Sequence, residues 1–299
     1  MTAAEQLGNG LDWAYLRAHP HNLDRLIEHQ RIRTTPLPGG DTCTAQRLTM
    51  DDGSSVFAKS VRGGTAAPAG FFGAEAAGLR WLAEAVPVPE VVAVTDSMLL
   101  LSWVESGPPS AAAAETLGRQ LAAMHRCGAP TFGAAWPGWI GPLALDNSAS
   151  TGWPDFYADQ RVRPYLRLAR DRGAMTAGQV AAVEHVLTRL DTLGVPTEAP
   201  SRLHGDLWLG NVLWSTDGRA FLVDPAAHGG HRETDLAMLA LFGLPHLDRV
   251  LAAYDEAWPL AAGWQQRVAL HQLHPLAVHA ALFGGGYAAR SAAAAQVYR

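Results

Sequence analysis

The sequence contains very little lysine. Of the 23 lysine and arginine residues among its 299 residues, only Lys59 is a lysine. Such a bias toward arginine reflects coding composition, so a lysine that remains is expected where arginine cannot replace it. The two cations differ physically, because lysine is a compact point charge and arginine is a broad planar fork. Lys59 is therefore the first candidate functional residue.

Cysteines, basic runs and long apolar runs are also scarce. The two cysteines, Cys43 and Cys127, give no disulfide framework and fit a reducing compartment. The first residues lack the basic and apolar regions of a secretory signal, and no apolar run reaches the length that spans a bilayer. A net charge of −5 without a basic run argues against nucleic-acid binding. We expect a cytoplasmic protein with no nucleic-acid or membrane partner.

Several enzyme signatures are absent. No G-x-S-x-G elbow supplies a hydrolase serine, and no G-x-G-x-x-G follows a strand to bind a dinucleotide. No C-x-x-C or H-E-x-x-H accompanies the histidines, which argues against structural zinc. The chain is 48% apolar and 17% charged, which is typical of a globular protein with one large or two smaller domains.

The richest segment spans residues 203–225. Asp217-Gly218 predicts a two-residue hairpin turn between the apolar runs N-V-L-W and A-F-L-V-D. With that turn, residues whose numbers sum to 435 oppose each other, so Asn211 faces Asp224. Directly opposed residues have Cβ atoms about 5 Å apart, close enough for an amide oxygen and a carboxylate to hold one hard cation.

Asp206 lies on the loop that leads into this end of the hairpin, five residues before Asn211. A carboxylate beside two metal ligands predicts phosphoryl transfer, with Asp206 orienting a hydroxyl next to Mg²⁺ on ATP phosphates. The spacing H-x-D-x4-N-x12-D also matches the catalytic and metal loops of protein kinases, with Gly205 in place of arginine. The alternative is an ordinary hairpin with turn-forming Asp and Asn near its ends.

Lys59 lies in the alternating strand S-S-V-F-A-K-S-V, which follows the Asp52-Gly53 turn. An earlier strand follows a second turn at Gly39-Gly40. Those glycines would let backbone N–H groups approach phosphates while Lys59 reaches the α and β phosphates. Most glycine pairs, however, are only turns.

A partner for Lys59 follows from helical spacing. Residues 71–85 are predicted to form a helix with Phe72, Leu79 and Leu82 on one stripe, and Glu75 falls on the same face. A buried carboxylate is costly unless it is paired, so an ion pair with Lys59 is expected. The alternative is an exposed glutamate on a short helix.

Breakers and caps divide the chain. The E-S-G-P-P segment at 105–109 is the best linker candidate, and Ser110 and Thr176 are predicted helix caps. Beyond the linker the chain is expected to be helical apart from the 211–224 hairpin. Before it we expect an N-terminal helix, three strands, one helix and two further strands, at residues 11–30, 31–37, 42–50, 54–61, 71–85, 90–94 and 98–104.

Together these motifs resemble the fructosamine (ketosamine) kinase family of the protein-kinase-like superfamily. The most specific stretches are H-G-D-L-W-x-G-N at 204–211 and G-H-R-E-x-D-L-A-M-L at 230–239. The segment G-W-P-D-F-Y-A-D-Q-R, which begins at Gly152, also looks like that family. The resemblance runs from about residue 36 to about residue 287. It departs at 142–147, where P-L-A-L-D-N replaces a Pro-Gln-x-Asn pattern that many members carry.

The resemblance implies an α+β, bilobal protein-kinase-like fold. Its small β-rich N-lobe, with one regulatory-type helix, would be residues 1–106, and its larger, mainly helical C-lobe would be residues 107–299. ATP would bind between them, with its adenine near the backbone of Trp103, Val104 and Glu105. Two residues would have structural roles, His204 in the catalytic loop and Asp235 as a brace for its backbone.

The resemblance also implies residue roles in the reaction. Asp206 becomes the catalytic base, Asn211 and Asp224 the Mg²⁺ ligands, and Lys59 with Glu75 the phosphate-anchoring pair. The resemblance further suggests six residues that would line the sugar site. The alternative for each is a role in packing. They are Trp153, Arg161, Trp208, His231, Glu233 and His279.

The implied reaction is ATP-dependent phosphorylation of the 3-hydroxyl of a ketosamine, a fructosamine or ribulosamine that is free or on a protein amine, in glycation repair. One alternative is phosphorylation of an aminoglycoside, a choline-like amine or another sugar, because the same scaffold serves them. A second alternative is a catalytically silent nucleotide-binding pseudokinase. Competent residues fill all five phosphate-handling positions, which argues against the pseudokinase.

Overall fold

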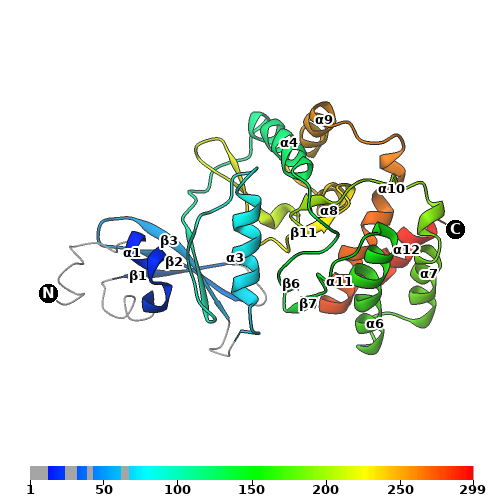
Figure 1. Cartoon of the computed structure of the whole chain (residues 1–299), viewed down its shortest axis with the longest axis horizontal. Coiled ribbons are helices and arrows are strands. Elements are labelled where there is room, and N and C mark those ends of the chain that lie inside the picture. Colours follow the sequence, from blue (N-terminus) through cyan, green and yellow to red (C-terminus); the bar gives the residue numbers. More distant parts are fainter. Residues whose placement is uncertain (1–12, 24–31, 39–42, 62–66, 299) are drawn as a thin grey trace.

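The computed structural model describes residues 13–23, 32–38, 43–61 and 67–298. A β-sheet forms the N-terminal part and helices form most of the C-terminal part, with helix α3 (Phe71–Leu82) between them (Figure 1). The predicted phosphate turn at Gly39-Gly40 lies outside the described residues. No helix in the described ranges is both long and apolar enough to cross a membrane.

The sheet has five antiparallel strands in the order β1-β2-β3-β5-β4. Lys59 is on the central strand and pairs with Ala45 on one side and Leu99 on the other. This position fixes the root of its side chain in the middle of the sheet. All five predicted strands are present, as β1 (Arg33–Leu37), β2 (Cys43–Thr49), β3 (Ser55–Val61), β4 (Val91–Val94) and β5 (Met98–Ser102).

Helix α3 presents Glu75 on its buried face, as predicted, and the carboxylate residue is only 8% exposed. The helix packs tightly against the segment that follows Asp224. A Cβ built on Gly78 would lie 3.1 Å from the Ala227 side chain and 3.3 Å from that of Pro225. A larger residue at position 78 would push this helix, and therefore Glu75, away from the segment after Asp224.

The N-terminal prediction is partly wrong. The expected single helix over 11–30 is interrupted within the described residues, because helix α1 (Trp13–Ala18) gives way to a 3₁₀ turn, η2 (Pro20–Asn22). Proline lacks the N–H that a continuing helix needs, so Pro20 ends α1. The remainder of that prediction, residues 24–31, falls outside the described part of the chain.

The helices of the C-terminal part begin where the caps predict. The Ser110 side chain accepts the N–H of Ala113 at the start of α4, and Thr176 forms a capping box with Gln179 at the start of α7. The helices are α4 (Ala111–Arg126), α5 (Trp153–Asp155), the π-helix η4 (Phe156–Val162), α6 (Arg163–Asp171), α7 (Ala177–Leu187), the 3₁₀ turns η5 (Leu190–Thr192) and η6 (Leu209–Asn211), α8 (Glu233–Phe242), α9 (Leu247–Ala257), α10 (Trp264–His271), α11 (Leu273–Phe283) and α12 (Tyr287–Gln296).

The prediction that this part contains one hairpin is wrong. Three antiparallel pairs occur in it: β6 (Gly138–Ile140) with β7 (Leu143–Leu145), β8 (Ser201–Leu203) with β11 (His228–Gly230), and β9 (Val212–Trp214) with β10 (Ala220–Leu222). Each of these strands has three residues, which is too short for apolar periodicity to reveal. The pair β8–β11 matters most, because it places the H-G-D loop beside the segment after Asp224.

The β9–β10 hairpin is present, but its predicted register is wrong by one residue. Opposing numbers sum to 434, as in the pair of Ala220 with Trp214. The N–H of Ser215 donates to the Arg219 carbonyl (2.9 Å), so the loop has three residues, with Gly218 in the left-handed region at φ 79°. A turn followed by a left-handed glycine is the common three-residue hairpin loop, and the D-G dipeptide fits it as well as a two-residue turn.

The slip changes the partner of Asn211. Its carbonyl accepts the N–H of Val223 (3.1 Å), so Asp224 lies one residue beyond the opposed position. Asp224 itself has a positive φ of 51°, which is uncommon outside glycine. This backbone turn, and not direct opposition on the hairpin, sets the direction of the Asp224 carboxylate.

The predicted linker does not run free. Its backbone bonds to the hairpin loop, because the N–H of Thr216 donates to the Glu105 carbonyl (3.0 Å) and the N–H of Gly107 donates to the Trp214 carbonyl (2.8 Å). The connection between sheet and helices is therefore fastened to the element that carries Asn211 and Asp224.

Candidate active site

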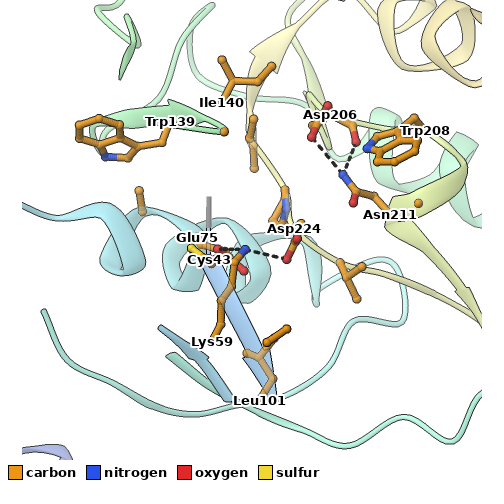
Figure 2. A pocket seen from close by; sticks show the side chains of 18 of the residues that line it. Cys43, Lys59, Glu75, Leu101, Trp139, Ile140, Asp206, Trp208, Asn211 and Asp224 are labelled. Atoms are coloured by element: carbon orange, nitrogen blue, oxygen red, sulfur yellow. Dashed lines mark hydrogen bonds and ion pairs between the residues drawn. The ribbon is translucent and has the colours of Figure 1, made fainter. Parts of the chain in front are cut away.

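A cavity of about 850 Å³ lies between the sheet, helix α3 and the helical part of the chain. Its lining includes Lys59, Glu75, Asp206, Asn211 and Asp224, which are the five residues predicted to handle phosphates and metal. Figure 2 shows these side chains converging from strand β3, helix α3, the H-G-D loop and the two ends of the β9–β10 hairpin. The size and the mixed polar and apolar lining suit a ligand as large as a nucleotide with an acceptor.

Lys59 bridges two carboxylates in this cavity. Its Nζ lies 2.8 Å from Glu75 Oε2 and 2.9 Å from Asp224 Oδ1, and the lysine is largely buried. Burial lowers the pKa of Lys59, but the charges of Asp224 and Glu75 outweigh it and raise the pKa above its usual value. Burial raises the pKa of Glu75 while Lys59 opposes the rise. The predicted partner is thus in place, and the lysine is held as a fixed cation.

Asp206 follows strand β8 and points into the cavity beside Asn211 (Figure 2). The Asn211 Nδ2 donates both to Asp206 Oδ2 (3.1 Å) and to the Asp206 carbonyl (2.8 Å). Burial raises the pKa of Asp206 to about 7, and the nearby carboxylate of Asp224 adds to the rise. A carboxylate with a pKa near 7 is suited to accept a proton from a hydroxyl at neutral pH.

The backbone of the H-G-D loop is fixed by the side chain of Asp235, the third residue of helix α8. Its Oδ2 accepts the N–H of His204 (2.8 Å) and its Oδ1 accepts the N–H of Gly205 (3.0 Å). Gly205 has φ 81°, and a Cβ there would lie 2.2 Å from the Ala226 carbonyl oxygen. The structure therefore gives a reason for glycine at this position, where protein kinases have arginine.

His204 ties the two loops together. One ring nitrogen, Nε2, lies 2.9 Å from the Val223 carbonyl, and the other, Nδ1, accepts the N–H of Asp206 (3.2 Å). Burial lowers the pKa of His204, although the charge of Asp235 partly opposes this, so the ring is neutral near pH 7. A neutral ring protonated at Nε2 satisfies both bonds.

One further residue of this support was missed in the sequence. His125, on helix α4, places Nε2 3.2 Å from Asp235 Oδ2 and Nδ1 2.9 Å from the Tyr254 hydroxyl. All three side chains are buried. A histidine on the apolar stripe of the predicted helix after Ser110 was the available signal, but only the fold reveals its partner.

The predicted adenine segment divides at Glu105. Trp103 and Val104 line the cavity, whereas Glu105 does not and instead accepts the Trp103 Nε1–H (2.8 Å). The Arg47 guanidinium lies over the Trp103 ring, 4.4 Å from its centroid. Glu105 and Arg47 therefore hold the indole at the edge of the cavity.

Comparison with known proteins fits this site. The family model described as "Fructosamine kinase" matches residues 21–297. The chain belongs to the fructosamine kinase family. A relative from Lactiplantibacillus plantarum named "Probable ketoamine kinase" is 36% identical over 222 residues, which are 73% of this chain and 78% of the relative.

Solved structures agree with that membership. A crystal structure from Thermobifida fusca, whose description carries the name fructosamine-3-kinase, is 50% identical with a TM-score of 0.86 and covers 92% of this chain and 96% of its own. A choline kinase from Streptococcus pneumoniae, at 15% identity, has a TM-score of 0.61 and covers 94% of this chain and 98% of its own. The latter shows the fold alone, and the predicted protein-kinase-like α+β fold is confirmed.

The acceptor residues that the fructosamine kinase family suggests fall into two groups. Trp208 and His279 line the cavity. The other four are buried outside its lining and are Trp153, Arg161, His231 and Glu233. Because these four side chains face the interior of the helical part, we propose structural roles for them. The sequence motif alone did not indicate this orientation.

Arg161 illustrates this role in the fructosamine kinase fold. It is 1% exposed, and its guanidinium donates to Asn147 Oδ1 (2.8 Å) and to the Asp146 carbonyl (2.5 Å). Burial lowers the pKa of Arg161 to about 9. Arg161 thus fixes Asp146 and Asn147, the end of the 142–147 segment in which this chain departs from the family pattern.

Glu233 belongs to a second buried network. Arg267 donates to both of its oxygens, at 2.6 Å and 2.9 Å, and His271 Nε2 lies 3.4 Å from Oε2. His231 stacks on His271 with the ring centroids 4.9 Å apart. The three groups His231, Glu233 and His271 are close enough to hold a metal ion, but the Arg267 guanidinium already neutralises the carboxylate and would repel a cation. We assign the network to packing at the start of helix α8.

This assignment predicts acid-sensitive stability. Burial raises the pKa of Glu233, but bonds from His271 and Arg267 outweigh this and lower it to about 2. A depressed pKa stabilises the fold above the unfolded pKa of about 4.5, and this contribution, on the order of 3 kcal/mol, is lost as the pH falls toward 2. Urea unfolding of Glu233→Gln should therefore differ most from the native protein above pH 5 and converge with it toward pH 2. The exposed-site control Glu256→Gln should show no such convergence.

Proposed function

We propose that this member of the fructosamine kinase family transfers the γ-phosphoryl group of ATP to the 3-hydroxyl of a ketosamine, free or on a protein amine. The observation that carries the proposal is the convergence of Lys59, Glu75, Asp206, Asn211 and Asp224 on one cavity. Phosphoryl transfer depends on positioning and charge stabilisation, which such a set supplies. The proposal includes action in glycation repair and a cytoplasmic location.

Each residue has a role in this scheme. Lys59, held by Glu75, would neutralise the phosphates of the nucleotide. Asp206 would accept the hydrogen bond of the acceptor hydroxyl and take its proton as the bond to phosphorus forms. We place the division between the lobes at residues 106 and 107 and the nucleotide between them, with the adenine beside Trp103 and Val104.

The oxygen ligands for magnesium fit the residues present. Because the Asn211 Nδ2 is occupied by Asp206, the amide oxygen is the atom left to bind a cation, and the Asp224 side chain is partly exposed to the cavity. Hard oxygen donors are the ligands that Mg²⁺ prefers. When bound there, the ion would supply positive charge to the phosphates of ATP during transfer of the γ-phosphoryl group.

An acceptor panel with coupled detection of ADP tests this function. The ketosamines fructosamine and ribulosamine, as small amine adducts, should be phosphorylated with a kcat/KM at least about a hundredfold above an aminoglycoside or choline. Mass spectrometry of the product locates the phosphate on the ketose. An aminoglycoside or choline that is active while both ketosamines are inactive would favour the alternative phosphotransferase, and ATP binding without any turnover would favour the pseudokinase.

A further inference from the structure

Among the described residues, the large apolar side chains that remain exposed are Trp208, Leu209, Phe283 and Val297, with exposed fractions of 37%, 43%, 52% and 65%. Two of them lie at the edge of the catalytic cavity. Trp208 and Phe283 line the cavity, and Leu209 adjoins Trp208 in the chain. Apolar surface that remains exposed beside a reaction site is a candidate binding surface.

The two lining aromatics belong to one chain of ring contacts. Trp208 meets Phe242 with centroids 5.9 Å apart, Phe242 meets His279 at 4.8 Å, and His279 meets Phe283 at 5.6 Å. Tyr287 completes the group at 5.0 Å from His279. We name these five residues the aromatic rim. Because Trp208 is two residues from Asp206, the rim begins beside the acceptor hydroxyl and extends outward over helices α8 and α11 and the start of α12.

The charges that line the cavity disfavour a carboxylate on the acceptor. Arg290, near the Tyr287 ring, lies outside the lining and donates to the Leu241 carbonyl (3.3 Å). Among the described residues of the cavity lining, Lys59 alone is a lysine or arginine, and it is already paired with Glu75 and Asp224. Within the described ranges the lining therefore offers a carboxylate on the acceptor no unpaired lysine or arginine, while Asp206 and the ring faces would attract a protonated secondary amine. Apolar groups attached to that amine would cover the exposed face of Phe283.

We propose that the aromatic rim, with Phe283 as its specificity-determining residue, binds the group carried by the ketosamine nitrogen. The protein then prefers ketosamines whose amine bears an uncharged apolar or aromatic group over those with a carboxylate beside the amine. This inference rests on the proposed function and narrows its substrate class.

Four adducts of one ketose test the inference, with ethylamine, benzylamine, alanine and phenylglycine as the amines. This set varies the aromatic ring and the carboxylate independently. The benzylamine adduct should have a kcat/KM about tenfold above the ethylamine adduct, and each amino-acid adduct should fall about tenfold below its uncharged counterpart. Phe283→Ala should bring the ratio of benzylamine to ethylamine close to one, and Phe283→Leu should leave an intermediate ratio. Val297→Ala, a second exposed apolar site, should leave the ratio at its native value.

The outcomes distinguish failure of the aromatic rim hypothesis from failure of the proposed kinase function. Equal kcat/KM values for benzylamine and ethylamine adducts, or a ratio that Phe283→Ala does not change, would overturn the rim while the kinase function stands. A preference for the amino-acid adducts would overturn the charge argument and point to Arg290, whose guanidinium lies 5.8 Å from the Tyr287 ring centroid. No phosphorylation of any adduct would overturn the proposed function together with the rim. Melting temperatures confirm that each variant is folded.

Discussion

Replacing Asp206 with asparagine is expected to lower kcat about a thousandfold while ATP still binds. Asparagine keeps the size of the side chain and can still contact Asn211, but it cannot take a proton from the acceptor hydroxyl. General-base groups typically contribute factors of about 10² to 10⁴ to the rate. Nucleotide affinity should change little, because Lys59 bonds to Glu75 and Asp224 and not to Asp206.

The measurements are single-turnover phosphorylation of a ketosamine and calorimetric titration with ATP. Asp217→Asn makes the same chemical change on the exposed hairpin loop, where the carboxylate bonds to Arg219, and should leave both measurements as they are. If Asp206→Asn turns over at the native rate, the role of catalytic base is wrong. If Asp206→Asn loses ATP binding as well as turnover, the substitution has disturbed the loop that Asp235 and His204 hold.

Replacing Lys59 with arginine is expected to impair both ATP binding and turnover, with a Kd about tenfold higher and a kcat about a hundredfold lower. The position is enclosed by Glu75 and Asp224, each within 2.9 Å of a single nitrogen. A planar guanidinium would place its charge over several atoms and would not fit between two carboxylates arranged around one ammonium.

The same two assays decide this case. Arg33→Lys, the reverse exchange at an exposed position on strand β1, controls for a general effect of swapping cations on the sheet. Native ATP affinity and turnover in Lys59→Arg would show that charge alone suffices and that the persistence of lysine at this position has another cause. A comparison with Lys59→Met separates the effect of charge from the effect of side-chain shape, because methionine removes the charge with little change of volume.

The positions of the residues around Lys59 and Asp206 could be predicted because the patterns that indicate them are local in sequence. The H-x-D-x4-N spacing and the helical stripe around Glu75 depend on short-range geometry, and both Lys59 and Glu75 lie where this reasoning places them. The roles of these residues in catalysis stay predictions, as does the phosphate contact of Gly39 and Gly40, which lie outside the described residues.

The predictions from sequence were wrong where the local structure depends on packing against residues distant in the chain. The register of the 211–224 hairpin turns on whether the loop closes at Ser215 or one residue later, which a D-G dipeptide does not determine. The burial of His231 and Glu233 depends on Arg267 and His271, which approach from helix α10. A polar residue in a motif can serve a cavity or a core, and its neighbours in the sequence do not distinguish the two.

The solitary lysine has a consequence for the protein's own chemistry. Reducing sugars condense with unprotonated amines, and every lysine side chain that a protein displays is a target for them. This chain offers only Lys59, whose side chain is 13% exposed and whose ammonium is kept protonated by two carboxylates. A protein proposed to act on sugar-modified amines therefore presents almost no lysine of its own to be modified. We expect it to resist glycation at sugar concentrations that modify other proteins.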